Sequence, residues 1–296
     1  RVLHMLRKYV GDKAFFASLK QYLETNKYKS VEIHDLRMAF EEITGEDLNW
    51  FFNQWFLSSG HPNLEFNYGY NDSLKQQSVT VYQLQNLENT PLYSLPISID
   101  IYQGGEVFTH KVTIDSVKQT FVFKVNGKPD LVNVDADKML LAVKQDFKTK
   151  EEWAFQYYNA PLFFDRREAV YRLSGLTNDS LAKIVIRSAL EDAHWDIRLF
   201  ALEKCKDQIA GYGSDILDQF TTIARTDKNS MVRGTAIKCL SEYFVADSTT
   251  ASNPVPTTIF EEALADPSYY VMGKSIKALA TRDESLAFQN INSWDP

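Results

Sequence analysis

The five histidines of this 296-residue sequence are the side chains best suited to hold a catalytic metal. A zinc hydrolase needs two imidazoles that converge on the ion, usually four residues apart on one helix face, together with a carboxylate. The histidines are His4, His34, His61, His110 and His194, and no two of them have that spacing. We therefore predict that this chain contains no catalytic, cofactor-binding or metal-binding residue, and that each histidine is a packed or solvated side chain.

Other kinds of catalytic site leave no recognisable pattern either. The sequence has no G-x-S-x-G elbow, no cysteine within a protease-like signature and no glycine-rich phosphate loop. Glu41 and Glu42 could be an acid–base pair, but adjacent residues point about 100° apart on a helix and cannot both face one substrate. Cys205 and Cys239 lack C-x-x-C spacing, so we predict that both are buried thiols.

The charge and the remaining aromatic pairs narrow the possible partners. The net charge of −7, without a basic cluster in the sequence, argues against nucleic acid or anionic lipid as the main partner. No run approaches the ~20 apolar residues of a membrane span, so we expect no membrane segment in this chain. The pairs Tyr157–Tyr158 and Tyr269–Tyr270 could line a groove, although core or rim packing is the more ordinary role of such pairs.

Residues 1–60 have the apolar spacing of helices. Asp12 is the expected N-cap of "KAFFASLKQYLETN", and Gly45 closes "DLRMAFEEIT". The helix within "LNWFFNQWFLSSGHPNL" is apolar on more than one side, since Trp50 lies off the main aromatic stripe, and it therefore needs partners on two sides. The chain opens inside a helical pattern without an initiator methionine, and we expect it to be a fragment of a longer protein.

Beyond Pro62 the apolar period changes to two. In "LPISIDIYQ", Leu95, Ile97, Ile99 and Ile101 alternate with more polar residues, as in a half-buried strand. Gly104–Gly105 and Asn126–Gly127 are hairpin signals between such strands. Several short strands joined by tight turns predict an antiparallel β-sandwich over residues 61–148.

Residues 149–296 are again helical and contain an internal repeat. The segments "ALEDAHWDIRLFALEKC", "ARTDKNSMVRGTAIKCL" and "ALADPSYYVMGKSIKAL" align, and "FDRREAVYRLSG" is a degenerate earlier copy. Each of the three has an Asp (Asp192, Asp227, Asp266), and two have an Arg six residues later (Arg198, Arg233), where the third has Met272. The spacing favours helix pairs of the HEAT type, in which each Arg reaches a neighbouring repeat's Asp. We prefer this structural role over substrate anchoring for Arg198 and Arg233.

The first sixty residues resemble the end of the catalytic domain of the zinc aminopeptidases related to aminopeptidase N and leukotriene hydrolase. The resemblance rests on "VLHMLRKYVGDKAFFASLKQYL" and on "DLRMAFEEITGEDLNWFFNQWFLSSGHPNL", which ends in that family's Trp, spacer and Gly-x-Pro. The resemblance also rests on the order of the regions along the chain, which is helical, then strands, then helical again. It implies a multidomain fold: the α-helical end of a thermolysin-like domain at 1–60, an antiparallel β-sandwich at 61–148, and an α-α superhelix of HEAT-like repeats at 149–296.

The resemblance also implies a mechanism for the parent enzyme, which removes N-terminal residues from peptides. There, H-E-x-x-H and a downstream Glu bind zinc, G-x-M-E-N holds the substrate's amino end, and a Tyr stabilises the oxyanion. None of these residues can be located in this sequence. The chain would then be an inactive C-terminal portion that encloses the active site and gates peptide access, with peptides as partners through the parent's catalytic domain.

Two alternatives remain at this point. The chain could be a stand-alone scaffold whose HEAT-like repeats bind a peptide or protein without catalysis. It could also be a complete hydrolase with a dispersed site that no sequence motif reveals.

Overall fold

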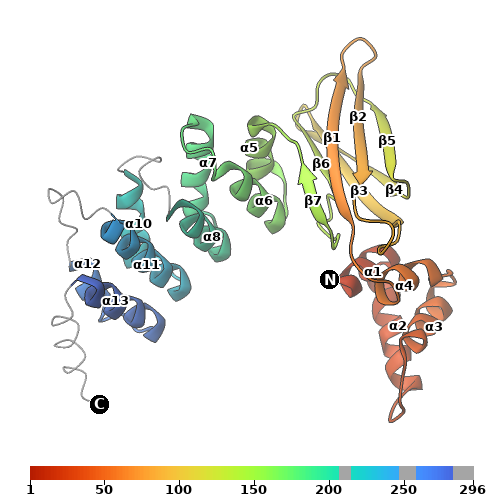
Figure 1. The fold of residues 1–296 in the computed structure, drawn as a ribbon, viewed down its shortest axis with the longest axis horizontal. Coiled ribbons are helices and arrows are strands. Elements are labelled where there is room, and N and C mark those ends of the chain that lie inside the picture. The colour runs from red at the N-terminus through yellow and green to blue at the C-terminus, as the bar shows by residue number, and fades with distance from the viewer. Residues whose placement is uncertain (207–214, 247–257, 283–296) are drawn as a thin grey trace. The chain divides into compact units, whose positions relative to one another are not determined.

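In a computed structural model the chain forms two compact units, Arg1–Glu152 and Trp153–Pro296. The structure describes residues 1–206, 215–246 and 258–282 (Figure 1). The elements run from four helices through seven strands to a second helical region. The sequence predicts a further boundary at residues 60/61. In the structure the helices before it and the strands after it lie in one compact unit, because they bury their apolar side chains in one shared core.

The first unit begins with four helices: α1 (Val2–Val10), α2 (Asp12–Thr25), α3 (Ile33–Thr44) and α4 (Asn49–Phe56). Gly45 ends α3 in the left-handed conformation with φ of 71°, as predicted. Asp12 is not the N-cap of α2, because Gly11 takes that position. Gly11 has φ of 82°, which a residue with a Cβ rarely adopts, and Asp12 instead pairs with Arg7 at 2.7 Å.

Helix α4 makes contacts on two sides, as its aromatic pattern predicts. Phe51 and Phe52 are buried in the core shared by helices and strands. The Trp55 ring lies 4.9 Å from that of Tyr93, which precedes β3. The chain then turns at Gly60, where φ is 85° and a Cβ would lie 2.4 Å from the Thr90 hydroxyl oxygen. Only glycine therefore fits this exit from the helix.

The seven strands form two small sheets. They are β1 (Asn63–Asn71), β2 (Gln76–Gln83), β3 (Leu95–Gln103), β4 (Glu106–Ile114), β5 (Lys118–Lys124), β6 (Leu131–Val134) and β7 (Val143–Asp146). The strand orders are β5-β2-β1-β7 and β4-β3-β6. The pairs β1–β2, β2–β5, β3–β4 and β3–β6 are antiparallel, as predicted. Strand β7 instead runs parallel to β1, at the edge of the four-stranded sheet.

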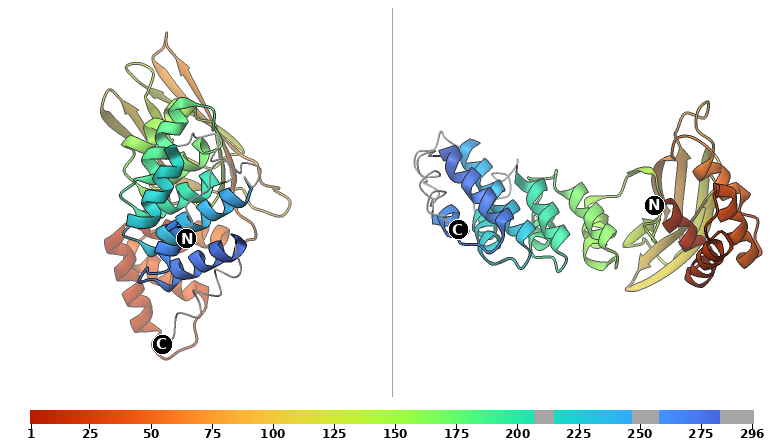
Figure 2. Two further views of the ribbon diagram at one scale, coloured as in Figure 1. Left: turned by 90° about the vertical axis from the view of Figure 1, so that its left-hand side faces the viewer. Right: turned by 90° about the horizontal axis from the view of Figure 1, so that it is seen from below.

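The second unit consists of helix pairs: α5 (Lys150–Asn159) with α6 (Phe163–Leu173), α7 (Ser180–Leu190) with α8 (Trp195–Cys205), α10 (Asp215–Thr226) with α11 (Ser230–Ala246), and α12 (Thr258–Ala263) with α13 (Tyr269–Arg282). The second helices of successive pairs contact one another, α6 with α8, α8 with α11 and α11 with α13 (Figure 2). Among the described residues, no helix has both the length and the apolar composition that a bilayer crossing requires.

Candidate functional site

The five histidines lie on separate elements. They are found on α1 (His4), at the start of α3 (His34), after α4 (His61), on β4 (His110) and before α8 (His194). The imidazole of His194 caps α8, because its Nδ1 accepts a hydrogen bond from the backbone N–H of Asp196 at 3.2 Å. Within residues 1–206, 215–246 and 258–282, no three His, Cys, Asp or Glu side chains are grouped so that they could hold a metal ion. The described residues therefore do not fit a zinc site.

The two adjacent glutamates serve separate structural contacts. Glu41 pairs with Arg37 at 3.0 Å, and its Oε1 accepts a hydrogen bond from the backbone N–H of Leu48 at 2.9 Å. The hydrogen bond from Leu48 joins α3 to the start of α4. Glu42 accepts a hydrogen bond from the Gln21 amide of α2. Because the two carboxylates face different partners, the structure does not bring them together on one substrate position.

Both cysteines are buried thiols, as predicted. Burial raises the pKa of the Cys239 thiol to about 12, so this group stays protonated at neutral pH. Its Sγ lies 3.7 Å from the backbone carbonyl oxygen of Leu202 on the neighbouring helix α8. A protonated and buried thiol is not a nucleophile, and these contacts assign Cys239 to packing between repeats.

Arginine and aspartate side chains connect successive helix pairs of the second unit. Arg166 pairs with Asp192 at 2.8 Å, Arg198 with Asp227 at 2.6 Å, and Arg233 with Asp266 at 2.7 Å. We call these three pairs the Arg–Asp ladder. The prediction that Arg198 and Arg233 reach the next repeat's Asp is confirmed, and the ladder also includes the degenerate first copy.

Each rung of the ladder is held by several hydrogen bonds. Arg198 donates from Nε and Nη2 to the two carboxylate oxygens of Asp227, and from Nη1 to the backbone carbonyl of Asp192 at 2.7 Å. Burial alone would raise the pKa of Asp227, but hydrogen bonds from Arg198 and from the backbone of Asn229 outweigh it and lower that pKa. The Asp227 carboxylate is thus ionised and bound to its own chain.

The tyrosine pairs have different environments. Tyr157 is buried and its hydroxyl donates to Asp192 at 3.2 Å, and burial together with that carboxylate raises the pKa of Tyr157 far above its usual range. Tyr158 is 52% exposed at the rim. Tyr269 is 87% exposed, whereas Tyr270 packs over Gly234 of α11, where a Cβ would lie 2.5 Å from the Tyr270 ring. Tyr157 therefore has the core role and Tyr158 the rim role considered from the sequence.

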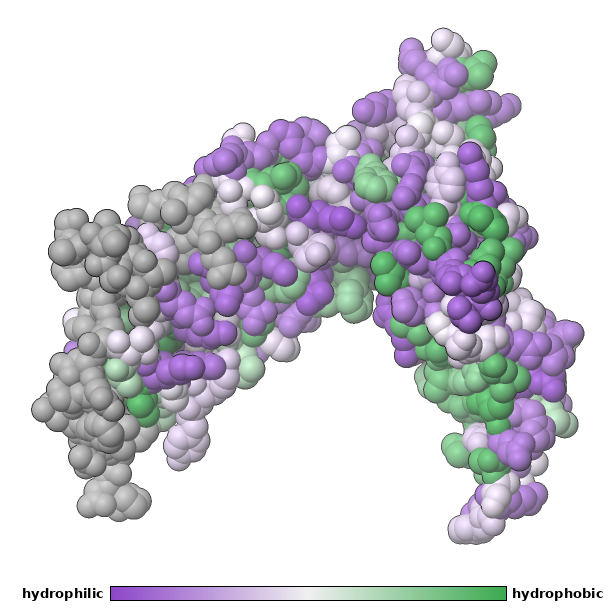
Figure 3. All heavy atoms as spheres, in the orientation of Figure 1, coloured by the Kyte–Doolittle hydropathy of each residue, from purple (hydrophilic) through white to green (hydrophobic). Residues whose placement is uncertain are grey.

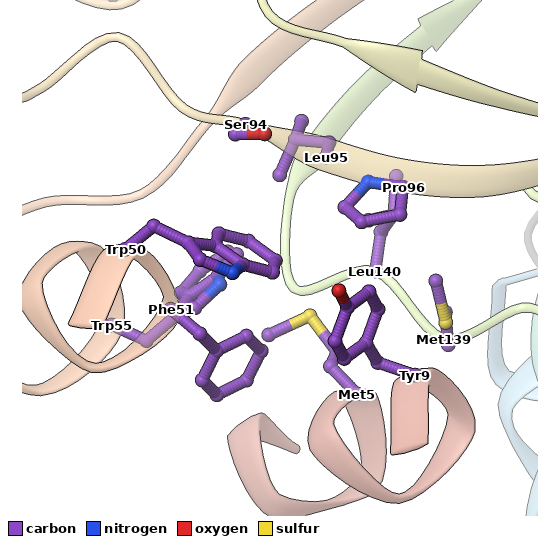
Figure 4. Close-up of a pocket in the computed structure, with 10 residues that line it drawn as sticks. All are labelled: Met5, Tyr9, Trp50, Phe51, Trp55, Ser94, Leu95, Pro96, Met139 and Leu140. Carbon is purple, nitrogen blue, oxygen red and sulfur yellow. The ribbon is translucent and has the colours of Figure 1, made fainter. Parts of the chain in front are cut away.

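An apolar pocket lies inside the first unit, between the helices and the strand segments (Figure 4). Its volume is about 20 Å³, which is room for about one water molecule. Trp50 and Trp55 of α4 face Leu95, Pro96 and Leu140 across this space. The lining offers aromatic rings, thioethers and aliphatic groups around a small space, so this arrangement is typical of core packing rather than of an acid–base reaction.

A buried charge beside this pocket was missed by sequence reasoning. Asp135 follows β6, is 1% exposed and has φ of 52°, a conformation that is uncommon for a residue other than glycine. Its carboxylate pairs with Lys144 at 3.2 Å and accepts a hydrogen bond from the backbone N–H of Met139 at 2.9 Å. The only sequence signal is a run of charged residues directly after the apolar strand "LVNV".

The loop organised by Asp135 contacts helix α1. Asp137 pairs with Lys8 at 3.2 Å, and the backbone carbonyl of Lys138 accepts a hydrogen bond from Arg1. The backbone N–H of Leu141 lies 3.4 Å from the sulfur of Met5. These contacts span up to 137 residues of sequence and fix α1 against the strand region.

Comparisons with known proteins identify relatives of this chain. Residues 1–55 match the Peptidase family M1 domain. The chain is 27% identical over 179 residues to a leucyl aminopeptidase of Saccharolobus solfataricus, which covers 60% of this chain and 20% of that protein. It is 39% identical over 62 residues to an aminopeptidase N of Lactococcus lactis subsp. lactis, covering 21% of this chain and 7% of that protein.

A third relative and a solved structure extend the likeness along the chain. A probable aminopeptidase 1 of Sulfurisphaera tokodaii is 21% identical over 248 residues, covering 82% of this chain and 26% of that protein. The crystal structure of Legionella pneumophila aminopeptidase A in complex with aspartic acid is similar with a TM-score of 0.72 at 13% identity. That similarity covers 99% of this chain and 40% of the solved chain, and it is a similarity of fold.

The chain spans between 7% and 26% of the length of the three curated relatives. The M1 family is zinc-dependent, and the described residues of this chain do not supply a zinc site. This chain is therefore a relative of the M1 family aminopeptidases that corresponds to a part of their length.

Proposed function

We propose that this chain is the C-terminal portion of a zinc-dependent aminopeptidase that removes N-terminal residues from peptides. In this proposal residues 1–60 complete the catalytic domain, the zinc ligands lie in a part of the protein outside this sequence, and the helical repeats enclose the active site and limit peptide access. The match of residues 1–55 to the M1 domain supports the first part. The small share of each relative that the chain covers is consistent with it.

The observation that carries the proposal is an apolar face on the helices that match the M1 domain. Several large apolar side chains of α1, α2 and α3 are exposed: Leu3 by 43%, Phe16 by 54%, Leu23 by 66%, Met38 by 56% and Ile43 by 39%. Figure 3 shows apolar side chains gathered over this helical region. Contiguous apolar surface of this kind marks a contact with another protein part. We assign that contact to the remainder of the catalytic domain.

The test compares the same substitution in two proteins. Phe16→Glu and Met38→Glu place a charge on the apolar face. In this chain alone they should change stability by less than about 0.5 kcal/mol, since surface substitutions rarely do more. In the full-length protein they should strongly lower both the yield of folded enzyme and its bound zinc, because a charge is then buried without a partner.

Leu74→Glu is the matched control, since Leu74 is 63% exposed in the turn between β1 and β2, away from α1–α3. It should leave both proteins unchanged. The assignment of the apolar face fails if Phe16→Glu is tolerated in the full-length protein as well as Leu74→Glu is.

The gating role has its own experiment. Deleting Trp153–Pro296, the second compact unit, from the full-length protein should leave zinc bound, since the proposed ligands lie elsewhere. Cleavage of longer peptides relative to dipeptide-sized reporters should change, because one wall of the substrate chamber is lost. A cooperative melt must first show that the truncated protein is folded. Unchanged relative kcat/KM across peptide lengths would remove the gating role and favour the scaffold alternative.

A further inference from the structure

A groove lies between α11 and α13, the second helices of the last two described pairs. Its volume is about 360 Å³, which is at the lower end of the roughly 300–1,000 Å³ of ligand sites in proteins. Helix α11 contributes Lys238, Ser241 and Glu242, and helix α13 contributes Lys274, Lys277 and Thr281. Lys238 lies three and four residues before Ser241 and Glu242, and Lys277 lies between Lys274 and Thr281 at the same spacings, so each set shares one helix face.

The close contact between the two helices explains where the groove begins. At Gly234 the Tyr270 ring lies directly on α11, because there is no Cβ between them. The groove residues Lys238 and Lys274 follow one helical turn later on α11 and α13. The two lysines, which are 36 residues apart in sequence, therefore line the same groove.

The groove is cationic within an acidic chain. Three of its lining residues are lysines and one is a glutamate, whereas the whole chain has a net charge of −7. Glu242 is shared, since it pairs with Lys238 at 3.7 Å and with Lys206 of α8 at 3.4 Å. Lys274 lies over the Tyr270 ring at 5.1 Å. Among the described residues, no carboxylate lies within ion-pair distance of Lys274 or Lys277.

We propose that the groove between α11 and α13 binds an acidic peptide segment, with Lys274 and Lys277 as its main charge partners. The ammonium groups can each pair with a carboxylate, and the Ser241 hydroxyl lies beside them as a hydrogen-bonding group. A single carboxylate would leave one of these two lysines unpaired, so a segment with two or more Asp or Glu residues fits better.

Charge complementarity also favours peptide over nucleic acid as the occupant. Nucleic acid requires a basic stripe that follows many phosphates, together with aromatic platforms for bases. The residues that line this groove include three lysines and no aromatic side chain, so it offers neither a long basic stripe nor a stacking platform for bases. The proposal concerns binding by this chain and does not depend on the proposed peptidase role.

The experiment measures binding of a fluorescently labelled acidic peptide to the 296-residue chain by anisotropy. The peptide has several Asp and Glu residues and an amidated C-terminus, so that side-chain carboxylates are the only acidic groups. We expect saturable binding that weakens as salt rises, because exposed charge pairs are screened. A peptide with Asn and Gln in place of the acids should bind much more weakly.

The variant Lys274→Ala/Lys277→Ala should weaken binding by about fivefold or more, as expected for the loss of two exposed pairs. Lys183→Ala/Lys228→Ala removes the same charge elsewhere in the second unit and should leave binding unchanged. Glu242→Gln should strengthen binding, because it removes a competing carboxylate from the groove. This gain keeps the test decisive even if the double variant is destabilised.

Three outcomes would overturn the proposal: equal binding of the acidic and amide peptides, equal effects of the two double variants, or no gain with Glu242→Gln. A fourth is tighter, lysine-dependent binding of a single-stranded oligonucleotide, which would assign the groove to nucleic acid. The assay involves neither zinc nor hydrolysis. A negative result therefore leaves the aminopeptidase proposal untouched, and failure of that proposal leaves this binding result valid.

Discussion

In the second unit the buried charges recur at intervals, whereas in the first unit each buried polar contact is made once. The rungs of the Arg–Asp ladder join residues 26, 29 and 33 positions apart. In the first unit, Gln54 bonds to Ser94 across 40 positions, and Arg1 reaches Lys138 across 137. Contacts between near neighbours in a repeat can be added one pair at a time. Contacts across a whole unit must form together, so the first unit should unfold more cooperatively than the second.

The largest expected effect tests that difference in the core of the first unit. Phe52→Ala removes a ring that is 2% exposed and stacked on Phe56, and it should cost about 3–5 kcal/mol. Hydrogen exchange should show lost protection in both the helices and the strands of the first unit, because they share one core. The comparable Phe220→Ala in α10 should loosen its neighbouring helices more than α5 and α6. If Phe220→Ala lowered hydrogen-exchange protection equally in all helices of the second unit, that result would contradict the comparison.

The next effect concerns a ladder rung. Arg198→Ala leaves the Asp227 carboxylate, which is 5% exposed, without its main partner, and it should cost about 3 kcal/mol. Arg167→Ala is the control, since Arg167 is 42% exposed and lies 3.8 Å from Asp196. That exposed pair should be worth less than about 1 kcal/mol. Chemical denaturation of each variant measures both values, and equal losses would mean that the ladder adds no more than a surface ion pair.

A smaller effect is expected from acid. The pKa values of Asp227 and Asp266 are lowered in the folded protein, so their contribution to stability is complete above the unfolded value near pH 4 and is lost as the pH falls through the folded values. The variant Arg198→Ala/Asp227→Asn lacks one such carboxylate. Its free energy of unfolding should therefore fall less between about pH 7 and pH 3 than that of the natural chain. An identical pH dependence would exclude Asp227 as a source of acid sensitivity.

The smallest expected effects come from two glycines on the neighbouring helices α11 and α13. Gly234→Ala would press on the Tyr270 ring and should destabilise the protein by about 1–3 kcal/mol. Gly273 has open space around its Cβ position, so Gly273→Ala should stabilise helix α13 by up to about 1 kcal/mol. If the α11–α13 contact is as close as described, thermal melts should show a lower Tm for Gly234→Ala and a higher Tm for Gly273→Ala. Stabilisation by both would mean that Tyr270 moves aside without cost.

Local patterns in the sequence were sufficient to predict the helical and strand regions and the Arg198 and Arg233 rungs of the Arg–Asp ladder. Leu95, Ile97, Ile99 and Ile101 are all buried along one face of β3, as their alternation predicts. The repeat of Asp and Arg predicts the contacts of Arg198 and Arg233, because each repeat meets its neighbour in the same way. Both features follow from a period that can be counted along the sequence. For a strand with one buried face the period is two residues, and for stacked helix pairs it is the length of the repeat.

Other features depend on residues far apart, and the tertiary structure decided them. The parallel pairing of β7 with β1, the buried pair of Asp135 with Lys144 and the shared groove of Lys238 and Lys274 have no local signature. Gly11 rather than Asp12 caps α2, because the turn between α1 and α2 requires a positive φ. Sequence spacing constrains which side chains share a face of one helix or strand. Which faces then meet depends on how apolar surfaces from the whole unit are buried together, and that is settled only on folding.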